Sequence, residues 1–140
     1  MKQIIMLFYL LILLVGNGCQ SGGGRLLHRD APGALGPYSG SVAYGDLIFV
    51  SGRIGQRGGS FEQEVMTAID SIEEELARAG STLADVVQST VFLIDLDRYG
   101  EFNTLYGQRF GPPYPARACI QVSRLPGDAR VEIQVIAAKP

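Results

Sequence analysis

Apolar residues recur along this chain with two periods, one typical of strands and the other typical of helices. A period of two, bounded by turn residues, predicts strands over residues 41–44, 47–51, 86–94, 116–123 and 130–137. A first helix is predicted between Ser60, which forms a capping-box pattern with Gln63, and Gly80. Asp97 is the predicted cap of a second helix that runs to about Phe110, with Tyr99, Phe102 and Leu105 also facing inward.

The order of these elements is ββαβαββ, which predicts an α+β fold with one mixed sheet and two helices on one face. The strand at 86–94 is apolar on both of its faces, yet two helices cover only one side of a sheet. The uncovered face would then expose a large apolar patch. We expect a second copy of the chain to cover it.

Arg117 and Glu132 are the ionisable residues that stand among apolar neighbours on the last two predicted strands. Alternation groups Arg117 with Cys119, Gln121 and Ser123, and we expect this group and Glu132 on the face without helices. The arginine and the glutamate would then meet across the sheet. Spacing alone more often indicates a structural ion pair, but a carboxylate clamp beside a proton-transfer group is also consistent with it.

Composition limits the choice of partners. The chain has 140 residues, which suffices for one domain, and a formal net charge of −2 with no basic run. This argues against nucleic acid as a partner. His28 is the only histidine and no CxxC occurs, so metal-ligand spacing is absent from the sequence.

The N-terminal sequence predicts export. An uncharged apolar run from Ile4 to Val15 precedes Gly18 and Cys19, which resembles a lipoprotein signal over residues 1–18 with Cys19 as the lipidated first residue. A flexible tether is then expected over residues 19–30, before a domain over residues 31–140. An ordinary cleaved signal and an uncleaved membrane anchor are the alternatives. The expected location is the periplasm or cell envelope.

Several short motifs occur in a fixed order through the domain. They are Gly36-Pro37-Tyr38, Phe49-Val50-Ser51-Gly52, residues 89–96 (STVFLIDL), Asn103-x-x-Tyr106, Pro115-Ala116-Arg117-Ala118-Cys119, and Arg124-Leu125-Pro126 followed by Val131-Glu132-Ile133. Together they resemble the RidA/YjgF family of enamine/imine deaminases. The resemblance covers residues 31–140.

The resemblance implies a chorismate-mutase-like α+β fold and a homotrimer with a site in each subunit cleft. It implies hydrolysis of 2-imino or enamine acids, such as 2-aminoacrylate, to 2-keto acids and ammonia, without a metal or organic cofactor. By position, Arg117 would hold the substrate carboxylate and Glu132 would activate water. The remaining implied substrate-binding residues are Tyr38, Ser51, Gly52, Asn103 and Cys119.

Two departures leave other functions open. Arg53 stands where relatives often have glutamine, and an export signal is unusual for this family. The first alternative is a non-catalytic trimeric module of the cell envelope that binds small carboxylates or proteins. RNA cleavage is a third hypothesis, against which the acidic balance and the export signal argue.

We predict that the mature protein begins at a lipid-modified Cys19. Mass spectrometry of the native N-terminus checks this, because the lipid adds a mass that an unmodified terminus lacks. An unmodified N-terminus beyond residue 19 would contradict the prediction and indicate an ordinary cleaved signal.

Overall fold

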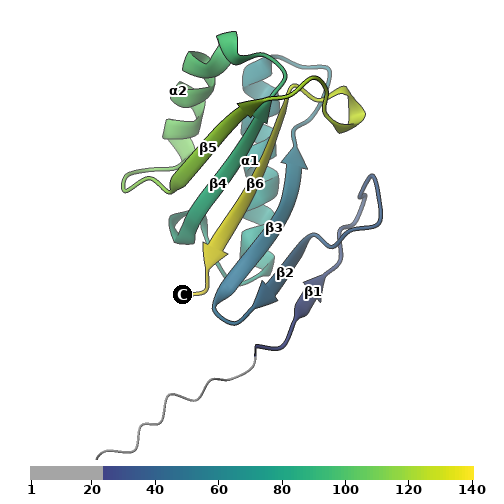
Figure 1. Ribbon diagram of the computed structural model, residues 1–140, viewed down its shortest axis with the longest axis vertical. Coiled ribbons are helices and arrows are strands. Elements are labelled where there is room, and N and C mark those ends of the chain that lie inside the picture. Colours follow the sequence, from purple (N-terminus) through teal and green to yellow (C-terminus); the bar gives the residue numbers. More distant parts are fainter. Residues whose placement is uncertain (1–23) are drawn as a thin grey trace, which may run out of the picture.

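The structure, a computed structural model, describes residues 24–140. The predicted signal over residues 1–18 and Cys19 lie outside them. Figure 1 shows a sheet backed by helices. The strands and helices are β1 (Leu27–Arg29), β2 (Ser41–Tyr44), β3 (Leu47–Ile54), α1 (Phe61–Arg78), β4 (Val86–Leu93), α2 (Tyr99–Arg109), β5 (Ala116–Gln121) and β6 (Val131–Ala138).

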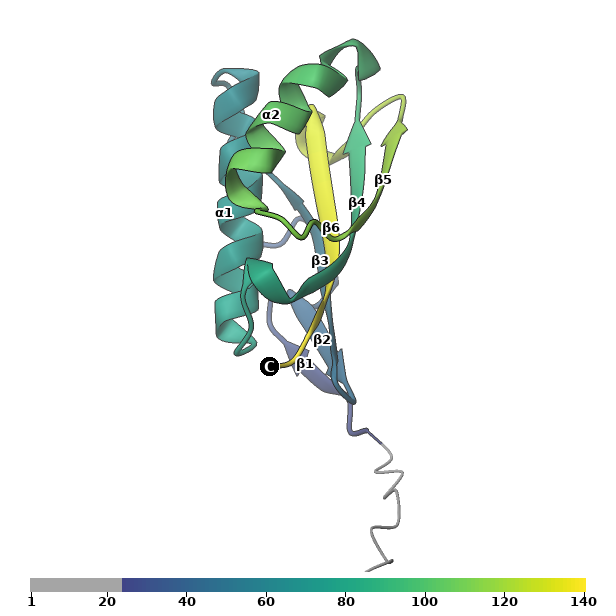
Figure 2. The same ribbon diagram turned by 90° about the vertical axis from the view of Figure 1, so that its left-hand side faces the viewer.

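The six strands lie in the order β1-β2-β3-β6-β4-β5. Only the β4–β5 pair is parallel among the described strands, and the other neighbours are antiparallel. Both helices lie against the same face of the sheet (Figure 2). The mixed sheet and the one-sided helix layer are therefore confirmed, and the predicted ββαβαββ order holds from β2 to β6, with β1 as an additional strand before it.

Helix α1 begins and ends as its sequence predicts. The Ser60 side chain accepts a hydrogen bond from the Gln63 backbone, and the Gln63 side chain accepts one from the Ser60 backbone. Gly80 follows the helix with φ of +80°, a conformation that glycine adopts without steric cost. The apolar stripe of α1 is fully buried against the sheet.

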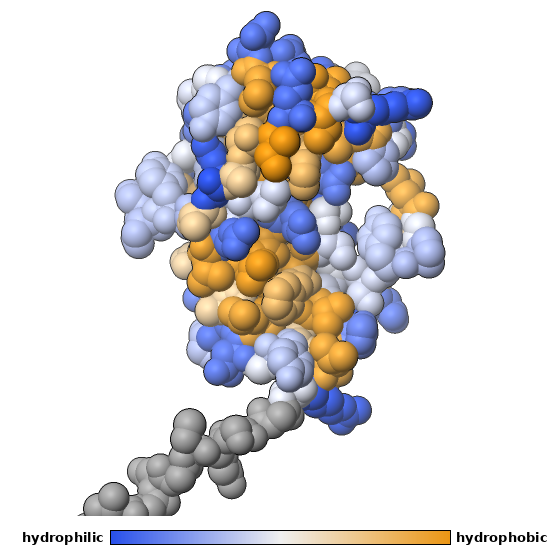
Figure 3. All heavy atoms as spheres, viewed as in Figure 1, coloured by the Kyte–Doolittle hydropathy of each residue, from blue (hydrophilic) through white to orange (hydrophobic). Residues whose placement is uncertain are grey.

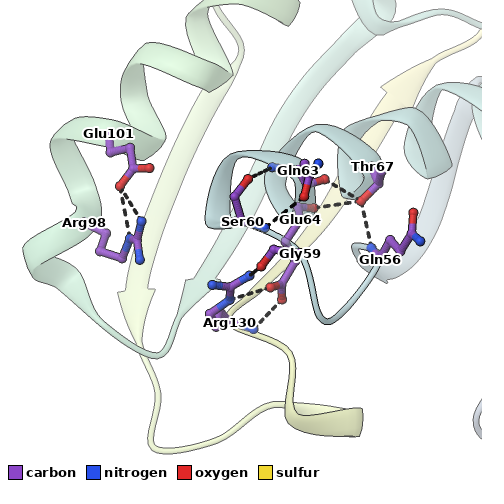
Figure 4. A network of polar contacts seen from close by, with 9 residues as sticks. All are labelled: Gln56, Gly59, Ser60, Gln63, Glu64, Thr67, Arg98, Glu101 and Arg130. Carbon is purple, nitrogen blue, oxygen red and sulfur yellow. Dashed lines mark hydrogen bonds and ion pairs between the residues drawn. The ribbon is translucent and has the colours of Figure 1, made fainter.

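Helix α1 also buries two carboxylates, and each is paired with arginine. Glu64 accepts hydrogen bonds of 2.6 Å from both the backbone N–H and the Nε of Arg130, at the start of β6 (Figure 4). Glu75 accepts from Arg53 at 2.9 Å, from Arg78 at 2.7 Å and from the Ser41 hydroxyl at 2.6 Å. These pairs fix both ends of α1 on the sheet, since a buried charge is tolerated only with such partners.

Two sequence predictions are wrong in this part of the fold. The tether was expected to reach residue 30, but Leu27–Arg29 form β1 and pair with β2. Asp97 was the expected helix cap, but the Asp95 side chain accepts from the Asp97 backbone and caps a short 3₁₀ turn before α2. Tyr99, expected to face inward, then begins α2 and is 42% exposed.

The face of the sheet without helices is apolar over much of its area (Figure 3). Its exposed side chains include Tyr44, Leu47, Phe49 and Ile120, which are 40–51% exposed. We call this helix-free surface of the sheet the open face. The described helices include none that is long and apolar enough to cross a membrane.

We predict that Glu64→Ala lowers the free energy of unfolding by about 3 kcal/mol, because it leaves the Arg130 N–H and guanidinium without their buried acceptor. Urea denaturation at one fixed protein concentration measures the effect. Glu74→Ala, which removes an exposed carboxylate from the same helix, is the matched control and should change stability by about 0.5 kcal/mol or less. Equal losses in the two variants would contradict the role of the Glu64–Arg130 pair.

Candidate active site

Arg117 lies on β5 and points to the helix side of the sheet. Its backbone partner on β4 is Ser89, which is fully buried beneath the helices. Cys119 pairs with the buried Val91 and packs against the same core. Paired residues on neighbouring strands share a face, so Arg117 and Cys119 both face the helix layer.

Helix α2 holds the Arg117 guanidinium in place. Nη2 donates to Asn103 Oδ1 at 2.6 Å and to the Tyr99 hydroxyl at 3.2 Å. The guanidinium carbon lies 4.7 Å from the Tyr106 ring centre and 5.6 Å from that of Phe102, within cation–π range. All hydrogen bonds that Arg117 makes within residues 24–140 leave from Nη2, so Nε and Nη1 can serve a ligand.

A cavity of about 320 Å³ opens beside this arginine. We call it the arginine half-site, and its lining residues are Asn103, Tyr106, Gly107, Tyr114 and Arg117. The arginine is its only charged residue. Arginine can bind a carboxylate through two parallel hydrogen bonds, so the half-site suits a small acid.

Glu132 lies on β6 and points to the open face, between the buried residues Val131 and Ile133. Its carboxylate lies over the backbone of Gly52, where any side chain would overlap it. A cavity of about 290 Å³ adjoins it. We call this cavity the glutamate half-site, lined by Leu35, Gly36, Tyr38, Gly52, Ile54, Pro126 and Glu132.

Glu132 has the electrostatic character of a proton-transfer group. Burial raises its pKa above the ordinary carboxyl value of 4.5, and within residues 24–140 no cation counters that shift. Burial is also the main cause that raises the pKa of Cys119, with Arg117 lowering it in part. The Cys119 thiol therefore stays protonated at neutral pH and is not an activated nucleophile.

Arg117 and Glu132 do not meet within one chain. Strand β4 lies between β5 and β6, and the two side chains point to opposite faces of the sheet. The sequence prediction that both lie on the helix-free face is thus wrong for Arg117 and Cys119 and right for Glu132. On β5 the apolar Ile120 is 47% exposed on the open face, so alternation groups the residues of this strand but does not assign them to a side.

Three further predicted residues occupy different positions around the glutamate half-site. Tyr38 and Gly52 line its cavity. The Ser51 hydroxyl donates to the Ser39 carbonyl at 2.6 Å, and the Ser51 N–H donates to the Gly40 carbonyl at 3.0 Å. Ser51 therefore ties the loop that carries Tyr38 to β3 and does not line the cavity itself.

Arg53 is directed away from Glu132. It pairs with Ile133 on the helix side of the sheet, and its guanidinium forms the ion pair with Glu75. A larger cavity of about 850 Å³ is lined by Arg53 and Arg57 together with Tyr38 and Gly52. Because Arg53 is held by Glu75, its position does not support a direct contact with an acid bound at Glu132.

Sequence reasoning missed the aromatic surroundings of Arg117. Tyr99, Asn103 and Tyr106 are spaced four and three residues apart on α2, so they share one helix face. That spacing was readable from the sequence. The contribution of Tyr114 could not be read from the sequence, because it depends on how the segment before β5 passes α2.

Within the described part of the chain, no group of three or more acidic, histidine or cysteine side chains could hold a metal ion.

Comparisons with known proteins agree on one family. The sequence model described as Endoribonuclease L-PSP matches residues 28–139. The RutC family protein y4sK of Sinorhizobium fredii is 41% identical over 115 residues, covering 77% of this chain and 91% of that protein. TdcF of Escherichia coli K12, provisionally named a reactive intermediate deaminase, is 34% identical over 120 residues, covering 79% of this chain and 93% of TdcF.

Solved structures share the fold. The crystal structure of yeast Mmf1 has a TM-score of 0.78 and 30% identity, covering 83% of this chain and 100% of that one. The structure of E. coli TdcF with bound serine has a TM-score of 0.73 and 32% identity, covering 82% of this chain and 98% of that one. With the match to the family model over nearly the whole described region, these likenesses show that the chain belongs to the RidA/YjgF family.

Proposed function

We propose that this protein hydrolyses reactive 2-imino acids and their enamine tautomers, such as 2-aminoacrylate, to 2-keto acids and ammonia. The observation that carries the proposal is that the two half-sites contain different functional groups. One offers a positioned cation for a carboxylate, and the other offers a carboxyl group whose pKa burial has raised. Membership of a family that includes TdcF supports it.

A complete site requires two copies of the chain, because each copy presents its half-sites on opposite faces of its sheet. We infer a homotrimer in which Arg117 of one subunit meets Glu132 of the next. Such a head-to-tail contact closes into a ring under three-fold symmetry. The exposed apolar side chains of the open face supply surface for this contact, since they would otherwise remain in water.

Substrate binding is assigned to Arg117. Its Nε and Nη1 would donate hydrogen bonds to the two oxygens of the substrate carboxylate, while Asn103 and the aromatic rings of α2 keep the guanidinium from turning away. The half-buried position strengthens this charge pairing. Binding in this orientation would place the imine carbon of the substrate toward the neighbouring Glu132.

Glu132 is assigned the proton transfers. An enamine first takes a proton from solvent at C3 and becomes the iminium ion, which is the protonated form of the imine. As the oxygen of a water molecule bonds to the imine carbon, Glu132 takes one water proton and passes it to the substrate nitrogen. The C–N bond then breaks while the C=O bond forms, and the hydroxyl proton leaves with ammonia as ammonium. The imine is already electrophilic, so positioning and one proton-transfer group suffice.

We also propose that the protein acts at the cell envelope, on the strength of its N-terminal sequence. A lipid-modified Cys19 would hold each chain at the membrane surface. Three anchored chains in a trimer would bind far more strongly, because each anchor raises the effective concentration of the others.

Mixing two inactive variants tests the shared site. Arg117→Ala and Glu132→Gln should each lower kcat/KM by about 100-fold or more when purified alone. When the two are co-expressed in equal amounts, each mixed trimer contains one intact site, so activity should return to about one quarter of the wild-type value. Keto-acid release from enzymatically generated 2-aminoacrylate is the measurement.

The result of this mixture separates the hypotheses. A mixture that stays inactive would contradict a site shared between subunits. Wild-type protein that binds small carboxylates without any turnover would instead favour the non-catalytic binding module. The same two variants mixed after separate assembly, without subunit exchange, are the control and should remain inactive.

The raised pKa of Glu132 predicts the pH dependence of catalysis. Glu132 acts as a base only when ionised, so kcat/KM should fall as the pH drops through its pKa, at a pH above 4.5. A profile of kcat/KM against pH, with the uncatalysed rate subtracted at each point, measures this limb. A limb at or below pH 4.5 would show that Glu132 is not the buried base.

A further inference from the structure

The cavity of about 850 Å³ beside Arg53 lies between α1, the loop after β3 and the turn that precedes β6. We call it the β3-end cavity. Its volume lies toward the upper end of the range for ligand pockets, roughly 300–1,000 Å³. Neither Arg117 nor Glu132 is among its lining residues, so the proposed reaction makes no use of this space.

Arg57 is exposed, yet its guanidinium is held at the wall of the β3-end cavity. Its Nη1 donates to the Gly127 carbonyl at 2.6 Å, which joins the loop after β3 to the turn before β6. Gly127 has φ of +64°, and a Cβ there would lie only 2.9 Å from the Arg57 Nη1. The loop is fixed on α1 in turn, because the Gln56 N–H donates to the Thr67 hydroxyl at 2.7 Å (Figure 4). Within residues 24–140, Arg57 makes no hydrogen bond through Nε or Nη2, so these groups can serve a ligand.

Arg53 brings a second positive charge to the cavity, and its ion pair cancels that charge only in part. The Glu75 oxygen that accepts from Arg53 at 2.9 Å also accepts from Arg78 at 2.7 Å. Two guanidinium groups therefore share one carboxylate, which leaves this cluster with a formal charge of +1. The Arg53 Nε is also buried without a hydrogen-bond partner among the described residues. With Arg57, the cavity wall has an excess of two positive charges.

The acidic residue that lines the β3-end cavity does not remove this excess. Asp128 is the one acidic residue among the described lining residues, and its carboxylate is paired with Arg124 at 2.7 Å. The remaining lining residues, apart from the two arginines, are uncharged. The cavity is therefore large, polar and positively charged, which are the properties of a site for an anion.

We propose that the β3-end cavity binds a small anion that carries two negative charges on oxygen atoms, such as a phosphate group or a dicarboxylic acid. The two excess positive charges match a divalent ligand. Arginine binds the oxygens of both phosphate and carboxylate through parallel hydrogen bonds. The inference is independent of the proposed function, because it uses neither Arg117 nor Glu132.

Calorimetric titration of the wild-type protein tests this site, with inorganic phosphate, succinate and acetate as the probes. At about pH 8 phosphate and succinate are mainly divalent and acetate is monovalent. At equal ionic strength, phosphate or succinate should bind about tenfold more tightly than acetate. Tighter binding of phosphate indicates a phosphorylated ligand, and tighter binding of succinate indicates a dicarboxylic acid. Equally weak binding of all three anions would overturn the proposal.

Two substitutions in the cavity wall should remove this binding. Arg57→Ala removes an exposed guanidinium and should weaken the affinity for the divalent anion by about tenfold or more. Ser71→Asp leaves both arginines in place but adds a carboxylate to the wall from α1, so it should weaken binding by a similar factor. Wild-type affinity in both variants would show that the anion does not bind in the β3-end cavity.

Two controls separate this cavity from other sites. Arg98→Ala removes one positive charge from a surface ion pair with Glu101, outside the cavity, and should keep the wild-type affinity. Arg117→Ala should keep it as well. Binding that survives in Arg57→Ala and is lost in Arg117→Ala would place the anion in the arginine half-site and overturn the proposal, whatever the outcome for the proposed reaction.

Discussion

The face of the β-sheet to which each side chain points determines where the candidate catalytic groups lie. Successive side chains of a strand point to opposite faces, and the two helices cover only one of them. Arg117 is thereby enclosed by α2, while Glu132 is directed to the open face. Strands β5 and β6 do not bring the two groups to one place within a chain, so the proposed reaction requires contact between copies.

Three glutamates illustrate how the fold separates structure from function. Glu64 and Glu75 are almost fully buried on α1, and each has arginine partners that satisfy its charge. Glu132 is less buried, but burial raises its pKa and no described cation lowers it again. A satisfied buried carboxylate fixes a helix on a sheet, whereas an unpaired one with a raised pKa is suited to proton transfer.

The sequence predicted the fold well because most of its signals are local. The capping box at Ser60, the glycine at position 80 and the strand alternation each depend on neighbouring residues. For the candidate site, the sequence named residues but did not place them relative to one another. The side to which Arg117 points depends on β4 separating β5 from β6, a long-range pairing that alternation does not encode. Strand β1 was missed for a related reason, since three residues carry too little pattern without their partner β2.

The departure at Arg53 affects the choice of substrate less than its charge suggests. Glu75 holds Arg53 on the helix side of the sheet, where Arg78 shares the same carboxylate. Arg53 therefore extends the contacts that fix the C-terminal end of α1, and through the Gly40 carbonyl it reaches the loop that carries Tyr38. Under the proposed function, the substrate carboxylate is therefore assigned to Arg117, whose Nη2 is held by Asn103, and not to Arg53.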